Sequence, residues 1–223
     1  MKYLSMSNLT KILTGNADRE THRKYFFVVM LIFWSGCLLS QLFFPGGYSI
    51  LDNYISDMGW IAVNPVGCWF FIVGGTLTGI LFIPHCLYIH RKLMPDFALF
   101  SYLSTFSCIV GSIGLMIVAL FTKDDFLKHV HDVAADVAFG GFGIGAFFMM
   151  FVLIRKIIIK ADWPKIYQFL IIYGGAIILG AVLLNIENNT LQQWMGLFTL
   201  MYWLIGIYLS TMVNRDREIK RNG

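Results

Sequence analysis

The segment of the chain that decides the fold reads His129-Val-His-Asp-Val-Ala-Ala-Asp-Val-Ala-Phe-Gly-Gly-Phe-Gly-Ile-Gly145. It begins with titratable residues and continues without a break into a glycine-rich apolar run that is long enough to cross a bilayer. At about 100° per residue, one helix face carries His129, Asp132, Asp136, Gly140 and Gly143. A carboxylate that meets lipid costs about 2.5–3.5 kcal/mol at the centre of a membrane helix, and less near the interface. We therefore expect Asp136 to point inward, with the other helices packed around this face.

The composition of the whole chain predicts an all-α polytopic membrane protein. Hydrophobic residues make up 57% of the 223 residues, charged residues make up 13%, and the mean hydropathy is +0.69. A soluble domain cannot bury that much apolar surface. No basic run is interleaved with aromatic residues outside the apolar segments, so we do not expect a nucleic-acid partner.

Six segments are apolar and long enough to span a membrane, which predicts a bundle of six transmembrane helices. Residues 1–24 precede them as an N-terminal segment that could form an interfacial helix, and a charged tail follows at residues 214–223. Asn64-Pro65 has the pattern of a helix N-cap followed by proline in the first helical position. Within the transmembrane domain, residues 25–213, the predicted spans are 25–44, 66–89, 97–121, 132–158, 166–184 and 191–213.

Positive charge is distributed unevenly between the two sides of the predicted bundle. Lys and Arg gather in the N-terminal segment, after the second span, between the fourth and fifth spans, and in the tail. The connections on the other side contain only Lys123 and Lys128. The positive-inside rule therefore predicts a protein of the cell membrane with both termini in the cytoplasm.

This orientation brings three polar clusters to the extracytoplasmic side. Acids, amides and imidazoles that converge at one rim are the groups that a polar site needs. The clusters are Asp52, Asn53, Ser56, Asp57 and Asn64 in the first loop; Asp124, Asp125, His129, His131, Asp132 and the deeper Asp136 around the start of the fourth span; and Asn185, Glu187, Asn188 and Asn189 in the last turn.

Several roles are open for these side chains. Two imidazoles and a carboxylate could hold a zinc ion with an open position for water, which makes His129, His131 and Asp132 weak metal candidates. Ser56 could act as a nucleophile if His129 or His131 reached it as a base. The alternative is structural, with Asp132 capping a helix, Asp136 bonded to a neighbouring helix and Ser56 in a turn. The candidate catalytic residues are Ser56, Asp57, His129, His131, Asp132 and Asp136, and the sequence specifies no cofactor.

His85 is a separate case, because it lies inside the second predicted span. An imidazole there either donates to a carbonyl of a neighbouring helix or takes part in a proton relay.

The first loop also carries a family resemblance. Ser56-Asp57-Met-Gly59, the glycine-rich run from Gly111 to Phe121, and the histidine-containing segment from His129 to Phe139 resemble the domain-of-unknown-function family 998 of six-span prokaryotic membrane proteins. The Ile-Ser-Asp loop shows a looser likeness to the DRAM and GPI-remodelling membrane proteins. The chain departs from the family pattern in having two histidines before the fourth span. The resemblance implies a six-helix fold, and the eukaryotic relatives point towards lipids.

Three functions follow as hypotheses. The first is a protein that binds or handles lipid headgroups in an extracytoplasmic polar pocket, with membrane lipids as its partners. The second is a membrane-embedded hydrolase or transferase, metal-assisted or using an acid–base pair from the same residues. The third is a scaffold without a ligand. The sequence leaves the substrate and the oligomeric state open.

Overall fold

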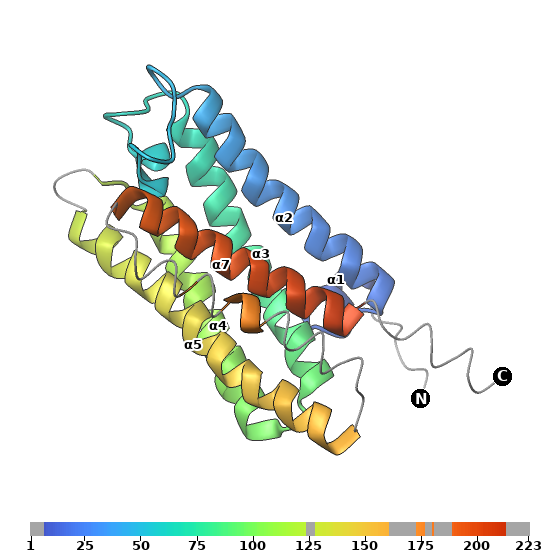
Figure 1. Cartoon of the computed structure of the whole chain (residues 1–223). Coiled ribbons are helices and arrows are strands. Elements are labelled where there is room, and N and C mark those ends of the chain that lie inside the picture. The colour runs from blue at the N-terminus through green and yellow to red at the C-terminus, as the bar shows by residue number, and fades with distance from the viewer. Residues whose placement is uncertain (1–6, 124–127, 161–172, 177–179, 181–188, 213–223) are drawn as a thin grey trace.

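The computed structural model describes residues 7–123, 128–160, 173–176, 180 and 189–212, and its long elements are all helices (Figure 1). Four of the described helices are long and apolar enough to cross a membrane. They are α2 (Arg19–Leu42), α3 (Cys68–Leu93), α4 (Ala98–Leu120) and α5 (Lys128–Lys160), the last of which is apolar as far as Arg155.

These helices coincide with the first four predicted spans, and the chain is an all-helical membrane protein. The sixth predicted span coincides with another long helix, α7 (Asn189–Met212). The fifth predicted span lies largely outside the described residues, so the count of six spans stays a prediction.

Local sequence explains where α2 begins and ends. The Asp18 carboxylate accepts hydrogen bonds from the backbone N–H of Thr21 at 3.0 Å and from its hydroxyl at 2.6 Å. These bonds lower the pKa of Asp18 and satisfy a free N–H of the first turn. The helix therefore starts at Arg19, six residues before the predicted span. It stops before Gly46 and Gly47, which adopt positive φ angles of 77° and 89°.

Glycines bring consecutive helices into close contact. A Cβ atom added at Gly36 of α2 would lie 3.0 Å from the Cα of Gly74 in α3. One added at Gly79 would lie 2.7 Å from the backbone of α4. One at Gly141 of α5 would lie 2.5 Å from the nitrogen of Gly111. Small residues allow membrane helices to approach in this way.

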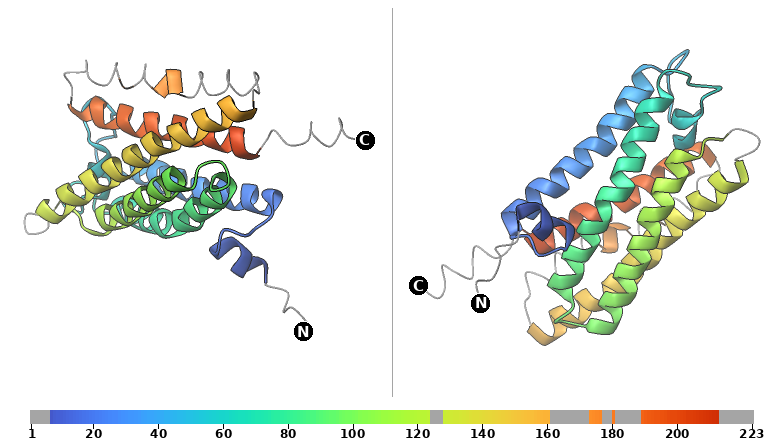
Figure 2. Two further views of the ribbon diagram at one scale, coloured as in Figure 1. Left: turned by 90° about the horizontal axis from the view of Figure 1, so that it is seen from below. Right: turned by 180° about the vertical axis from the view of Figure 1, so that it is seen from behind.

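The two ends of the bundle differ. At one end the loop after α2, which includes the short 3₁₀ helix η1 (Ile55–Gly59), gathers beside the first turns of α5 and α7 (Figure 1). α7 crosses the other helices, and Figure 2 shows it next to α5. At the opposite end lies α1 (Asn8–Leu13), which exposes Leu9 and Leu13 one turn apart. Such an apolar pair suits a helix at a membrane surface, which is the location predicted for this segment.

Candidate functional site

Residues 43–67, which we call the cap loop, are held together by the buried side chain of Asn64. Its amide N–H₂ donates to the carbonyl oxygens of Ser40 at 3.2 Å and Met58 at 3.0 Å. Its Oδ1 accepts from the N–H of Gly67 at 3.0 Å. This last bond is of the kind predicted for the start of the second span, although the regular helix begins at Cys68. One amide thus joins the end of α2, η1 and the start of α3.

Asp57 connects the cap loop to the chain that follows α4. Its Oδ2 accepts from the backbone N–H of Tyr54 at 2.8 Å, and its Oδ1 lies 3.0 Å from the Nζ of Lys123. The Lys123 ammonium also lies 4.4 Å from the centre of the Tyr54 ring. The two charged side chains are only 12% and 19% exposed. The first loop and the connection before α5 are therefore joined through Asp57 and Lys123.

The cap loop is also bonded to α7. The Oε1 of Gln193 accepts from the N–H of Ile55 at 2.8 Å, and the indole of Trp194 donates to the Tyr48 hydroxyl at 3.0 Å. Burial raises the pKa of the Tyr48 phenol, so this hydroxyl stays protonated. Asn189 is exposed at the first position of α7. The other members of the third predicted cluster, Asn185, Glu187 and Asn188, lie outside the described residues, as do Asp124 and Asp125 of the second.

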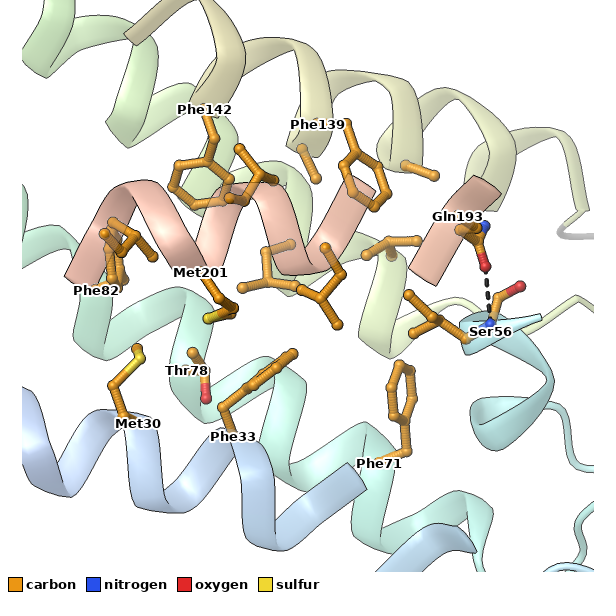
Figure 3. Close-up of a pocket in the computed structure, with 18 of the residues that line it drawn as sticks. Met30, Phe33, Ser56, Phe71, Thr78, Phe82, Phe139, Phe142, Gln193 and Met201 are labelled. Carbon is orange, nitrogen blue, oxygen red and sulfur yellow. Dashed lines mark hydrogen bonds between the residues drawn. The ribbon is translucent and has the colours of Figure 1, made fainter. Parts of the chain in front are cut away.

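An elongated cavity extends from the cap loop between α2, α3, α4, α5 and α7 (Figure 3). It holds about 910 Å³ of empty space, including the part that opens to the surroundings. Figure 3 places Ser56 and Gln193 at one end and Met30 and Phe82 at the other. The lining is apolar except for a few side chains, which include Ser56, Thr78, His131 and Gln193.

The end of the cavity near the cap loop carries three polar groups with unused hydrogen-bonding capacity. The Ser56 hydroxyl is buried and has no hydrogen-bond partner in the part of the chain that the structure describes. The Nδ1 of buried His131 lies 2.7 Å from the carbonyl oxygen of Phe121. Because a carbonyl only accepts, Nδ1 carries a proton and donates this bond, and in the tautomer that the bond selects Nε2 is an acceptor. Gln193 uses its Oε1 as described above, while its N–H₂ has no partner among the described residues.

The prediction that Asp136 points inward is wrong. His129, Asp132 and Asp136 are all exposed, and added Cβ atoms at Gly140 and Gly143 would meet none of the described residues within 4 Å. The opposite face of α5 packs on α4 instead, through its small residues Ala134, Ala138, Gly141 and Gly145.

The position of Asp136 close to the end of the bundle explains why an outward-facing carboxylate costs little free energy here. Ala138 packs against Gly114, six residues before the last residue of α4, Leu120. Asp136 lies half a turn closer to that end, which puts it roughly 6 Å inside the end of α4 at a rise of 1.5 Å per residue. A carboxylate so near the interface can extend to water, and its cost there is small.

The three weak metal candidates are separated. His131 faces the cavity, whereas Asp132 is exposed and His129 lines a shallow groove on the outside of α4 and α5. Among the described residues, no three His, Cys, Asp or Glu side chains are placed to hold a metal ion. His131 is therefore the histidine that shares a cavity with the cap loop, and His129 does not.

A second polar group lies towards the other end of the bundle. The Nδ1 of His85 is 3.0 Å from the Nε2 of His22, and both rings are buried. The partner of His85 is thus another imidazole rather than a helix carbonyl. His22 also stacks on Tyr88 with ring centres 3.7 Å apart. Sequence reasoning missed His22 because it lies among charged residues, before the predicted span begins.

His85 lines a smaller cavity of about 310 Å³. Phe82, Trp203 and Leu204 line both this cavity and the larger one, so the two are neighbours. Sequence reasoning also missed Lys123 and Gln193 at the cap-loop end. The signal for Gln193 was a pair of glutamines at positions 192 and 193, close to the start of an otherwise apolar helix.

Comparison with known proteins gives one match. A family model described as "Protein of unknown function (DUF998)" matches residues 27–213, which is most of the chain. The comparisons with curated proteins and with solved structures give no significant match.

Proposed function

Because the chain belongs to the DUF998 family, whose description gives no function, we propose a function from the cavity: the protein binds a lipid-like amphiphile within its helices. The polar group of the ligand lies at the cap-loop end, between Ser56, His131 and Gln193, and its hydrocarbon chain lies along the apolar wall. We propose six spans with both termini in the cytoplasm, which puts the cap loop on the extracytoplasmic side.

The observation that carries this proposal is the distribution of polar groups along the cavity. Gln193 and Leu204 of α7 both line it, and at 1.5 Å per residue they are separated by about 16 Å. That length is close to half of a hydrocarbon core of about 30 Å, which is the depth that one leaflet's chains reach. A cavity with one polar end and an apolar interior of this length suits a molecule with one headgroup and a chain.

The charges at the polar end favour a neutral headgroup. Lys123, which follows α4, is bonded to Asp57 of the cap loop and lies over the Tyr54 ring. An anionic headgroup would have to compete with that carboxylate. Ser56, Nε2 of His131 and the amide of Gln193 instead offer a mixture of donors and acceptors. Hydroxyl, ester and amide headgroups match this mixture.

The proposal can be tested by identifying lipids that stay bound to the purified protein. The protein is extracted in mild detergent, and its lipids are compared by mass spectrometry with those of the whole membrane. We expect enrichment of a neutral amphiphile. Leu200→Trp, which fills the cavity from α7, should abolish the enrichment, because Leu200 is one of the lining residues.

Phe198→Trp is the matched control. Phe198 also lies on α7, but its side chain is 38% exposed and does not line the cavity. This variant should keep the bound lipid. Equal lipid profiles in wild type and both variants would overturn the proposal and favour the scaffold hypothesis, in which the cap-loop network only holds the helices together.

A further inference from the structure

We propose that Ser56 and His131 form a nucleophile–base pair that cleaves a carboxylic ester in the bound amphiphile. This inference rests on the proposed binding function and names a chemical class of ligand for the same cavity. The substrate class is a neutral ester of a long-chain acid or alcohol.

The first support is the state of the Ser56 hydroxyl. Its Oγ is buried and has no hydrogen-bond partner in the described part of the chain, and Ser56 is one of the residues that line the cavity. Leaving a buried hydroxyl unpaired is unfavourable, so such a group in a folded protein calls for an explanation. A hydroxyl that must stay available for a reacting ligand is one explanation, and it accounts for the position of Ser56 at the polar end.

The second support is the orientation of His131. The bond from Nδ1–H to the Phe121 carbonyl fixes the ring and selects the tautomer with a lone pair on Nε2. In many catalytic sites a carboxylate accepts this hydrogen bond and orients the histidine. Here a backbone carbonyl accepts it instead. His131 also lines the same cavity as Ser56. The two groups are not hydrogen-bonded to each other, and catalytic hydrogen bonds commonly tighten only when substrate is present.

The other titratable groups near Ser56 do not fit the role of the base. Both oxygens of the neighbouring Asp57 are engaged, one by the Tyr54 N–H and the other by Lys123. His129 is exposed and lines the outer groove instead. Gln193 contributes differently, because its amide N–H₂ is an available donor for the oxygen that becomes negative during ester cleavage. Figure 3 shows Gln193 beside Ser56.

The reaction balances with water as the only co-reactant. The Ser56 oxygen bonds to the ester carbonyl carbon while its proton passes to Nε2 of His131. The bond from that carbon to the alkoxy oxygen then breaks, and the leaving alcohol takes the proton from His131. A water molecule cleaves the acyl–serine bond in the same two stages, which releases the carboxylic acid and restores the Ser56 hydroxyl. The net change is one ester and one water converted to one acid and one alcohol.

The test uses a long-chain alkyl fluorophosphonate as an active-site label, with the full chain in mild detergent. We expect wild type to form a covalent adduct that tryptic mass spectrometry locates on Ser56. Ser56→Ala removes an unpaired hydroxyl, so this variant should fold normally and show no adduct. His131→Asn keeps an amide donor near the position of Nδ1 but has no Nε2, and its labelling should be slower by about 10²–10⁴-fold, the usual contribution of a general base.

Ser107→Ala is the control, because Ser107 lies on α4 and does not line the cavity. It should label like wild type. The same four proteins are assayed for release of acid from a long-chain p-nitrophenyl ester. An unlabelled wild type, or equal labelling of wild type and Ser56→Ala, would overturn the inference. If wild type still carries an enriched amphiphile in that case, the binding function stands and only the cleavage fails.

Discussion

The inner and the outer face of α5 both carry small residues and a histidine, but the inner face packs against other helices and the outer face is exposed. The inner face presents His131, Ala134, Ala138 and Gly141 to α4 and the cavity, and the outer face presents His129, Asp132, Asp136 and Gly140 away from the bundle. The inner face contains no acid. Close contact with α4 excludes a charged side chain that has no partner, so the face that packs is the one made of alanine and glycine.

The comparison teaches that glycine alone does not identify a packing face in a membrane helix. Gly140 and Gly141 are adjacent in sequence, yet among the described residues an added Cβ would meet another helix at Gly141 and not at Gly140. The two faces differ in their acids: Asp132 and Asp136 lie on the outer face, and the inner face has no acid. The following variants compare the two faces directly.

The largest difference is expected between Gly141→Leu and Gly140→Leu. A side chain at position 141 would collide with the backbone of Gly111, which an added Cβ would approach to 2.5 Å. We expect a loss of about 3 kcal/mol or more, since overpacking of this kind cannot be relieved by side-chain rotation. Position 140 has open space, so Gly140→Leu should be within about 0.5 kcal/mol of wild type. Thermal unfolding in detergent, followed by size-exclusion chromatography, measures both; equal stability of the two variants would contradict the observed contact.

A smaller difference is expected between two acids, Asp57 and Asp136. Asp57→Asn leaves the partly buried Lys123 without its counter-charge and should destabilise the protein by about 1–3 kcal/mol. This cost is smaller than that of breaking a fully buried ion pair, because both side chains are partly exposed. Asp136→Asn should change stability by less than about 0.5 kcal/mol. The double variant Asp57→Asn with Lys123→Met should be less damaged than the sum of its single changes. Strict additivity would show that the pair is not coupled.

The smallest expected effect is a difference in chemical reactivity between His129 and His131, which is measured on the wild-type protein. Diethyl pyrocarbonate carbethoxylates accessible imidazole nitrogens, and His129 is exposed whereas His131 is buried and bonded through Nδ1. Mass spectrometry after brief treatment should find the adduct on His129 and spare His131. Modification of both residues at similar rates would show that the inner face is open to reagents, and the assignment of His131 to the buried face of α5 would then fail.

Much of the fold could be predicted from the sequence because membrane helices are recognised by their length and apolar composition. The predicted first four spans match α2 to α5. The bond between Asp57 and Lys123, which joins the first loop to the segment after α4, was not predicted.

The error at Asp136 came from expecting that an acid one turn inside the apolar segment must be sheltered by other helices. Helical periodicity identifies which residues share a face, but it does not say which face is turned inward. That choice depends on partners such as Gly111, which are distant in sequence. The roles of Gln193 and His22 were missed for a similar reason. Each residue bonds to a partner that is distant in sequence, Ile55 for Gln193 and His85 for His22.

The side chains of Phe82, Trp203 and Leu204 stand between the large cavity and the smaller one beside His85. A helix bundle hollow along its full length would dissipate the ion gradients that a cell membrane maintains. With three bulky apolar residues dividing its interior, the proposed binding of a guest molecule from one leaflet would leave the bundle an electrical insulator.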